Sequence, residues 1–396
     1  MLLFFPVRAL FGADITVPRL EWATRAASEG GEFVVSSAAA ADIALEGGYK
    51  YGALLGLSFE SADLGKALAY RNFTLQPGTS DPPTQSEYNA LVDRMNNQAV
   101  LSFRIAKATA RNLFNLPLEV SYFIGIADNF CSGDDFVSRF GTAPIGTGFR
   151  GFYYFPTGID GNISHQYNGI HGVRGTGLSF SLSSWDFIVP MFYIYQDFSF
   201  VDETLGISEN GHYSGDLRVL FNREKFKMEA FMGGTVSKSS DPIIRGGLLA
   251  YFSSGMGTEF LLQFGVPGWA GEDFSIDNFY FLIEPRIDFG LLATHITFFY
   301  HPLIYLQKEN NSERGKADIN MKVFAGDLGE SGLEGGLEIT TGLKVGEMEN
   351  FSIYASPFAS FVTTGLRWDV KIRLDLRSFD DPGSLLALFM GIRTAY

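Results

Sequence analysis

The fold is decided by residues 364–376, which read TGLRWDVKIRLDL. Apolar and charged side chains alternate there without a break. The apolar set is Leu366, Trp368, Val370, Ile372, Leu374 and Leu376, and the charged set is Arg367, Asp369, Lys371, Arg373 and Asp375. A helix would spread the apolar residues around its circumference, whereas a strand puts them on one face and the charges on the other. The segment is therefore predicted to be a β-strand.

The same two-residue period recurs along most of the chain. It is found in residues 42–60, 99–109, 116–127, 171–182, 185–195, 213–221, 226–232, 246–252, 258–266, 279–289, 294–300, 317–325, 337–343, 351–361 and 385–396. The strands average about ten residues, the length that crosses a bilayer at a tilt near 45°. A soluble sandwich is the alternative, but its strands usually run to only about five or six residues. We therefore expect an all-β fold, a closed antiparallel transmembrane β-barrel of about 16 strands (range about 14–18) with long external loops.

The composition excludes several other classes of protein. The 396 residues contain one cysteine, Cys131, and carry a net charge of −14. One cysteine cannot form a disulfide framework or a multi-cysteine zinc site, and the acidic balance argues against nucleic acid as a partner. Neither GxSxG nor HExxH nor a phosphate-binding glycine loop occurs, so we expect no enzyme activity and no cofactor or metal site.

The two ends of the strand pattern divide the chain. Residues 1–12, MLLFFPVRALFG, are predicted to be the remnant of a signal peptide, with an ordinary hydrophobic N-terminus as the alternative. Residues 13–40 are assigned to an N-terminal segment, a candidate plug of the barrel lumen. Residues 41–396 are assigned to the barrel, with long loops at 61–98 and 128–170.

The C-terminal strand carries a resemblance to a known class. Its apolar residues alternate from Leu386 onward, and the chain ends on an aromatic residue. This resembles the C-terminal signal of porin-like bacterial outer-membrane β-barrel proteins, in which a glycine and a terminal aromatic residue are read by the barrel assembly machinery. Gly391 and Tyr396 fall at matching places, whereas Thr394 departs from the apolar residue usual there. The resemblance implies a location in the bacterial outer membrane, with its lipid and the assembly machinery as partners; an oligomer stays open.

The long connection at 128–170 is the candidate constriction. Connections alternate between short and long, which predicts short periplasmic turns and long external loops. A connection this long is either functional or disordered, and its FRGFYYF motif is too aromatic for free solvent. It is expected to fold into the lumen as the third external loop of general porins does, with a surface loop or an extra strand pair as the alternatives. Its charged residues Asp134, Asp135, Arg139 and Arg150 would then line the narrowest point.

The faces opposite the lipid supply the remaining candidates. Glu284, Arg286 and Asp288 form one ladder, and Arg367, Asp369, Lys371, Arg373 and Asp375 form another, either as ion pairs or as the source of a field across a pore. Other positions expected to face the lumen are apolar, namely Ile188, Phe192, Ile194, Tyr280, Leu282, Phe299, Tyr354 and Phe358. They suit either a packed internal plug or passage of hydrophobic compounds, as in the long-chain fatty acid transporter family. The Asn-Pro-Ala motif of that family's hatch is absent from residues 13–41.

These observations predict an outer-membrane channel for passive diffusion of small solutes. The alternatives are a barrel that takes up hydrophobic compounds and a surface-exposed binding protein anchored by a barrel.

Overall fold

The computed structural model describes residues 13–29, 31–70, 85, 99–152, 155–157, 169–182, 185–199, 201–202, 207–208, 211–237, 241–271, 274–305, 315–329, 331–344, 351–378 and 385–394. The predicted signal remnant at 1–12, most of loop 61–98 and Tyr396 lie outside these residues. None of the described helices has the length and apolar character required to cross a membrane.

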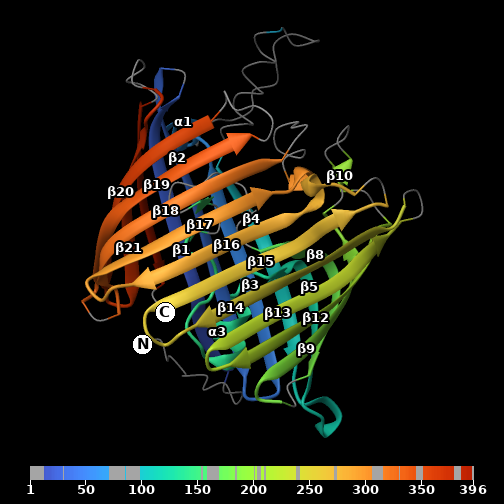
Figure 1. The fold of residues 1–396 in the computed structure, drawn as a ribbon. Coiled ribbons are helices and arrows are strands. Elements are labelled where there is room, and N and C mark those ends of the chain that lie inside the picture. The colour runs from blue at the N-terminus through green and yellow to red at the C-terminus, as the bar shows by residue number, and fades with distance from the viewer. Residues whose placement is uncertain are drawn as a thin grey trace, which may run out of the picture.

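One antiparallel sheet of eighteen strands forms the wall (Figure 1). Its strands are β1 (Ala13–Glu29), β2 (Glu32–Gly47), β3 (Tyr51–Ser61), β4 (Val100–Ala110), β5 (Leu118–Phe130), β8 (His171–Leu182), β9 (Ile188–Asp197), β12 (Tyr213–Arg223), β13 (Phe226–Val236), β14 (Ile243–Ser253), β15 (Thr258–Trp269), β16 (Tyr280–Asp288), β17 (Leu292–His301), β18 (Lys316–Asp327), β19 (Leu333–Lys344), β20 (Phe351–Thr363), β21 (Leu366–Asp375) and β22 (Leu386–Thr394). The connections contain α1 (Leu64–Tyr70), η1 (Leu113–Asn115), α3 (Asp135–Phe140), η2 (Ile276–Asn278) and two small hairpins, β6 (Arg150–Phe152) with β7 (Phe155–Thr157) and β10 (Val201–Asp202) with β11 (Ile207–Ser208).

The sheet closes on itself between its first and last strands. β1 pairs with β2 on one side and with β22 on the other, where Glu21 lies opposite Arg393 and Ala27 opposite Ala387. The seam leaves the wall without a free edge, so the hydrogen bonds of neighbouring strands run around the whole circumference. The predicted closed antiparallel barrel is confirmed, but it has eighteen strands instead of about sixteen.

The two additional strands come from the segment expected to plug the lumen. Residues 13–29 form β1 and residues 32–40 form the first part of β2, and both strands are part of the wall, so the plug assignment was wrong. Because β2 continues to Gly47, the predicted strand at 42–60 is divided between β2 and β3. Alanine occupies both faces of β2: Ala38 and Ala40 are buried inside, while Ala39 and Ala41 alternate with them on the outside. An alanine on each face removes the contrast between apolar and polar positions that the alternation argument needs.

The connections differ in length between the two ends of the barrel. At one end, called here the short-turn end, lie tight turns such as Glu224–Lys225 and Thr364–Gly365, together with the first and last described residues of the wall. Thr364 and Gly365 both have positive φ, 50° and 80°, as a two-residue hairpin turn of the type I′ kind requires. The opposite end, the long-loop end, carries the connections 62–99, 131–170 and 302–315.

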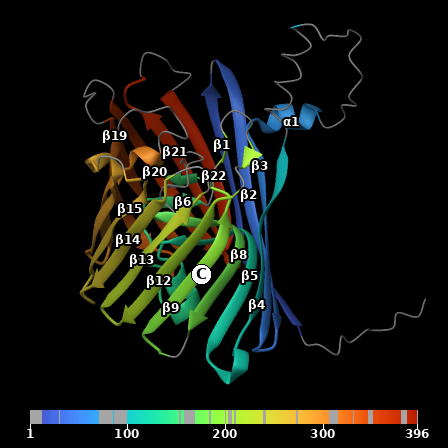
Figure 2. The ribbon, with the colours of Figure 1, turned by 90° about the vertical axis from the view of Figure 1, so that its right-hand side faces the viewer.

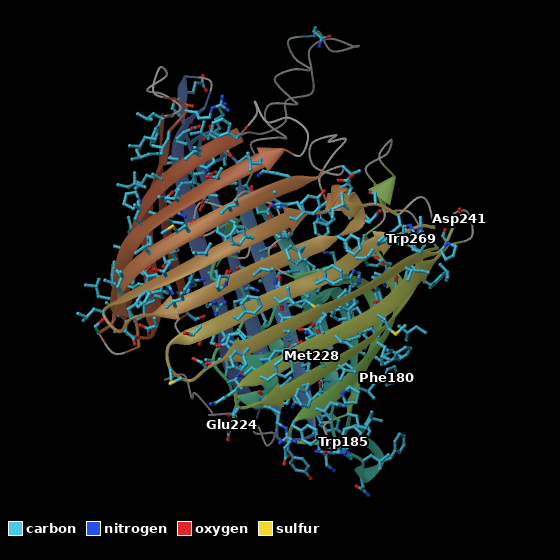
Figure 3. The ribbon with its side chains drawn as sticks, viewed as in Figure 1. Phe180, Trp185, Glu224, Met228, Asp241 and Trp269 are labelled. Atoms are coloured by element: carbon cyan, nitrogen blue, oxygen red, sulfur yellow. The ribbon has the colours of Figure 1, made fainter. Side chains whose placement is uncertain are left out.

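The barrel is apolar outside, and charged side chains are buried inside it. Outward residues such as Phe192 and Met232 are 44 % and 65 % exposed, whereas the charged side chains of Arg218 and Glu284 are fully buried within. Figure 3 shows Phe180 and Met228 on the outer surface between Trp185 at the short-turn end and Trp269 at the long-loop end. An apolar outer band flanked by aromatic residues is typical of barrels that face lipid.

Candidate permeation path and the inward loop

The connection after β5 turns into the barrel. The backbone leaves the wall at Cys131, whose φ is 59°, and α3 ends at Gly141 with φ 63°. Phe136, Ile145 and Phe149 are at most 2 % exposed, and they belong to one core with lumen-facing residues of the wall. We call residues 131–149 the inward loop. A surface loop would leave these rings in water, so their burial explains why the chain folds inside.

The start of the inward loop is tied to Arg218 on β12. The guanidinium of Arg218 donates to Glu229 at 2.7 Å, to Asp128 at 2.9 Å and to Asp135 of the loop. Glu229 in turn accepts the backbone N–H of Cys131. One buried cation therefore joins three strands of the wall to the first residues of the loop. Its hydrogen bonds are charge-assisted, and such bonds are stronger than those between neutral groups.

The electrostatics of Asp135 follow from this arrangement. Burial raises the pKa of its carboxyl, but attraction to Arg218 and Arg139 and the hydrogen bond from Arg218 outweigh burial and lower the pKa to about 2. Asp135 therefore stays ionised, and stays bound to Arg218, through the neutral range.

The second half of the inward loop is held by Glu284 on β16. Its buried carboxylate accepts the N–H of Gly148 at 2.9 Å and the hydroxyls of Thr147 and Thr297, the latter at 2.7 Å. The guanidinium of Arg286 donates to Glu284 at 2.7 Å and to the carbonyl of Gly146. A Cβ added to Gly148 would lie 2.8 Å from Nδ1 of His295, so glycine permits this close approach.

Two further contacts fix the loop. Gln263 on β15 donates to the carbonyl of Cys131 at 2.8 Å, and Arg139 donates to Glu119 on β5 at 3.0 Å. Burial lowers the pKa of Arg139, but attraction to Glu119 outweighs it and the net pKa is raised.

The following strand β6 contacts β1 (Figure 2), so the chain crosses the lumen from the β12–β17 wall to the seam.

The wall of β18–β22 and β1–β4 is lined by paired charges. The bonds are Lys371 to Glu338 at 2.9 Å, Lys322 to Glu334 at 2.9 Å, Arg367 to Asp369 at 2.8 Å, Arg111 to Glu46 at 2.6 Å, Arg19 to Glu21 at 2.9 Å and Arg104 to Asp42. Asp134 on the inward loop is exposed and close enough to Arg19 of β1 to interact electrostatically. Acidic and basic groups are therefore paired along this wall.

The structure separates the predicted lumen residues into groups. Arg367, Asp369, Lys371, Arg373 and Asp375 lie on the charged wall; Arg373 stacks on Tyr354 and Phe389 at 4.8 and 5.5 Å, and Asp375 accepts Arg377 N–H at 2.9 Å. Glu284 and Arg286 instead bind the inward loop, while Asp288 is exposed at the short-turn end. Of the loop residues, Asp135 and Arg139 bind the wall and Asp134 is exposed. Arg150 belongs to β6, and Gly391 lies in β22 opposite Asp369.

Part of the predicted apolar lining was wrong. Tyr280, Leu282 and Phe299 face inward and are buried, but Phe192 and Ile194 of β9 are exposed on the outer surface with Ile188 on the same face. The inward positions of β9 are Val189, Met191, Tyr193 and Tyr195, which pack in the same core as the inward loop. A strand that is apolar on both faces gives no alternation from which to read its inner side.

Several buried charged residues of the lumen were missed by sequence reasoning. Arg218 and Glu229 anchor the loop, and Arg245 binds Asp216 with two hydrogen bonds of 2.7 and 2.9 Å. Asp216, Arg218 and Glu229 occupy charged positions within alternating strands, so the same signal that picked out the Arg367 ladder would have found them. Arg245 lies just before the predicted strand 246–252. Among the described residues, no group of three or more His, Cys, Asp or Glu is placed to hold a metal ion.

Comparison with known proteins places this architecture among solved barrels. No family model and no curated protein matches the chain. Similar structures include OpdO of Pseudomonas aeruginosa, with a TM-score of 0.51 at 10 % identity over 96 % of each chain. They also include OccAB1 of Acinetobacter baumannii, with a TM-score of 0.50 at 12 % identity over 96 % of this chain and 95 % of that one. A mutant porin of Rh. blastica matches at a TM-score of 0.43 and 9 % identity, covering 97 % of this chain and all of that one. The chain has a porin-like β-barrel architecture, and at these identities the likeness extends to the fold alone.

Proposed function

We propose that the protein is an outer-membrane channel for passive diffusion of small solutes, with the inward loop as its constriction. One observation carries the proposal: the loop covers the apolar part of the inner wall, whereas the wall of β18–β22 and β1–β4 is lined by paired charges. Water and polar solutes pass along charged walls. An electric field between Asp134 on the loop and Arg19 on β1 would act on ions that pass between them. The apolar outer band supports insertion in lipid, with the short-turn end in the periplasm. The proposal includes the barrel assembly machinery as a partner and leaves an oligomer open.

Uptake of hydrophobic compounds is the second candidate. Such uptake would use the inward apolar side chains. Of these, Tyr280, Leu282 and Phe299 are buried in one core with the inward loop, and Tyr305 packs against that core. A hydrophobic compound would need to displace those contacts, so the arrangement favours polar solutes. A barrel that serves only to anchor a surface-exposed binding site is the third candidate.

Conductance across a planar bilayer tests the proposal. The refolded full chain should give steady single-channel steps, and replacing residues 134–146 by a short Gly-Ser linker should raise the step size. A silent barrel that speeds entry of a lipophilic dye into vesicles would favour the second candidate. A silent barrel without dye uptake would favour the anchored binding protein.

A further inference from the structure

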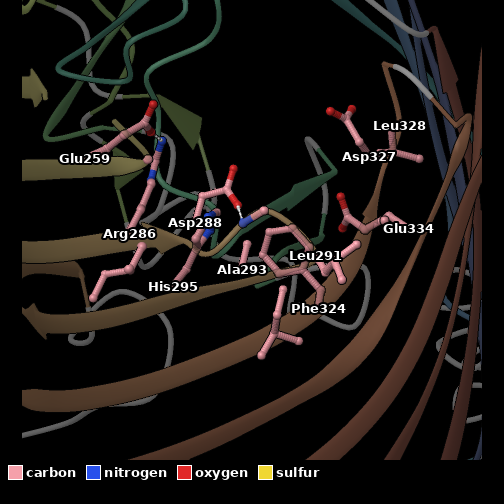
Figure 4. Close-up of a pocket in the computed structure, with 15 residues that line it drawn as sticks. Glu259, Arg286, Asp288, Leu291, Ala293, His295, Phe324, Asp327, Leu328 and Glu334 are labelled. Carbon is pink, nitrogen blue, oxygen red and sulfur yellow. Dashed lines mark hydrogen bonds and ion pairs between the residues drawn. The ribbon is translucent and has the colours of Figure 1, made fainter. Parts of the chain in front are cut away.

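A pocket of about 340 Å³ lies at the short-turn end (Figure 4). Its walls come from the ends of β15–β19 and from the turns that join β14 to β15, β16 to β17 and β18 to β19. Arg286, which holds the inward loop through Gly146, forms part of the lining, so the pocket lies beside the base of that loop. Its volume is within the lower range of sites for small organic molecules.

The pocket's lining is acidic. The carboxylates of Glu259, Asp288, Asp327 and Glu334 line it, and Figure 4 shows Asp327 and Glu334 across from Glu259 with Asp288 between them. The guanidinium of Arg286 is engaged by Glu284 at 2.7 Å and by the Gly146 carbonyl. Arg286 also pairs with Glu259 at 3.4 Å, and Lys322 pairs with Glu334 at 2.9 Å. The four carboxylates of the lining still outnumber these two cations. The pocket therefore favours a positively charged occupant.

Apolar surface lies beside these carboxylates. The ring of Phe324 lines the pocket, with His295 edge-on at 5.0 Å and Nζ of Lys322 at 4.5 Å from the ring centroid, and Leu291 at the mouth is 90 % exposed. A hydrated metal ion would gain nothing from such surface, whereas an organic cation would bury its apolar body against it. Acidic and apolar groups in one pocket select a molecule that carries both a cation and an apolar body.

We propose that this pocket binds an organic cation of the arylalkylammonium kind. The ammonium group lies between Asp288 and Asp327, and the apolar body lies against Phe324 and Leu291. The inference rests on the proposed channel function, because the solute reaches the pocket through the lumen, and it adds a substrate class to that function.

Fluorine NMR on the detergent-solubilised full chain tests the site without relying on conductance. The probe is 4-fluorobenzylammonium, and 4-fluorobenzoate is the anion of similar size. The double variant Asp288→Asn with Asp327→Asn keeps the side-chain oxygens that accept the Gly290 and Gly329 N–H groups, each at 2.6 Å. Losing two carboxylates should weaken cation binding by on the order of a hundredfold, about tenfold each. The control Asp375→Asn removes a lumen carboxylate that caps a turn at the long-loop end, and it should change binding less than twofold.

A second variant tests the apolar half of the site. Phe324→Leu keeps every charge and should weaken binding by about threefold through loss of the ring face. Equal binding of the cation and the anion, or unchanged cation affinity in the double variant, would overturn the site. Loss of heat-modifiable gel mobility would mean that the double variant does not fold into a barrel. In that case the Phe324→Leu variant and the comparison of cation with anion binding test the site. A protein that binds the cation but does not conduct would refute the channel and leave the pocket, and conduction without charge-selective binding would refute the pocket alone.

Discussion

Replacing Glu284 by alanine should undock the second half of the inward loop. The carboxylate accepts two hydrogen bonds from the loop, from Gly148 N–H and the Thr147 hydroxyl. Hydrogen bonds to a charged group contribute about 1.5–3 kcal/mol each, so the docking free energy should fall by about 3 kcal/mol or more. The undocked fraction of the loop then rises by about a hundredfold, because each tenfold step corresponds to about 1.4 kcal/mol.

Single-channel recording measures the effect. Glu284→Ala should give larger mean conductance and frequent transitions between levels, because the loop moves in and out of its docked position. The matched control is Glu338→Ala, which removes a buried lumen carboxylate that pairs with Lys371 and, within the described part of the chain, makes no hydrogen bond to the loop. The control should shift ion selectivity while its current steps stay steady. If Glu284→Ala gives quiet steps of unchanged size, Glu284 does not hold the loop.

Three further predictions follow from the same geometry. Asp134→Lys should shift ion selectivity toward anions in reversal-potential measurements with the barrel intact. Asp135→Lys should instead undock the loop, because it places a second cation at Arg218. Identical effects of the two variants would contradict the different placement of Asp134 and Asp135. Because the pKa of Asp135 is lowered from 3.8 to about 2, its contribution to docking is complete above about pH 4 and is lost as the pH falls through 2, so current noise should stay low from pH 7 to 4 and rise only below that. Val370→Arg on the outer face should destabilise the barrel by about 2–4 kcal/mol in urea-titrated refolding into vesicles, whereas Arg373→Ala should cost little, and equal costs would contradict the assigned faces.

Most of the wall could be predicted because a closed barrel imposes a period of two on its strands. The Leu366–Leu376 segment shows this clearly, since Arg367, Asp369 and Lys371 meet ion-pair partners inside and the apolar residues lie outside. Prediction failed where that contrast disappears. The alanines of β2 fit either face, and β9 is apolar on both because its inner side packs against the loop.

The candidate site was less predictable than the wall. The length and aromatic content of the 128–170 connection indicated an inward course, but the docking contacts join residues far apart in the chain. Thr147 meets Glu284, and Asp135 meets Arg218, because the barrel brings these strands to one side of the lumen. Alternation shows only that a side chain faces inward, and it does not indicate whether that side chain meets solvent or a loop.

The seam between β1 and β22 has a consequence for how the protein forms. Its pairs, such as Trp22 with Ile392, join residues from opposite ends of the chain. Closing such a contact requires nearly the whole polypeptide, and long-range pairing slows folding because chain entropy is lost before the contact is made. Until the last strand arrives, β1 presents an unpaired edge able to add foreign strands. The interval between synthesis and closure is therefore the time at which this chain is most prone to aggregate, and shielding of β1 during that interval would determine its yield.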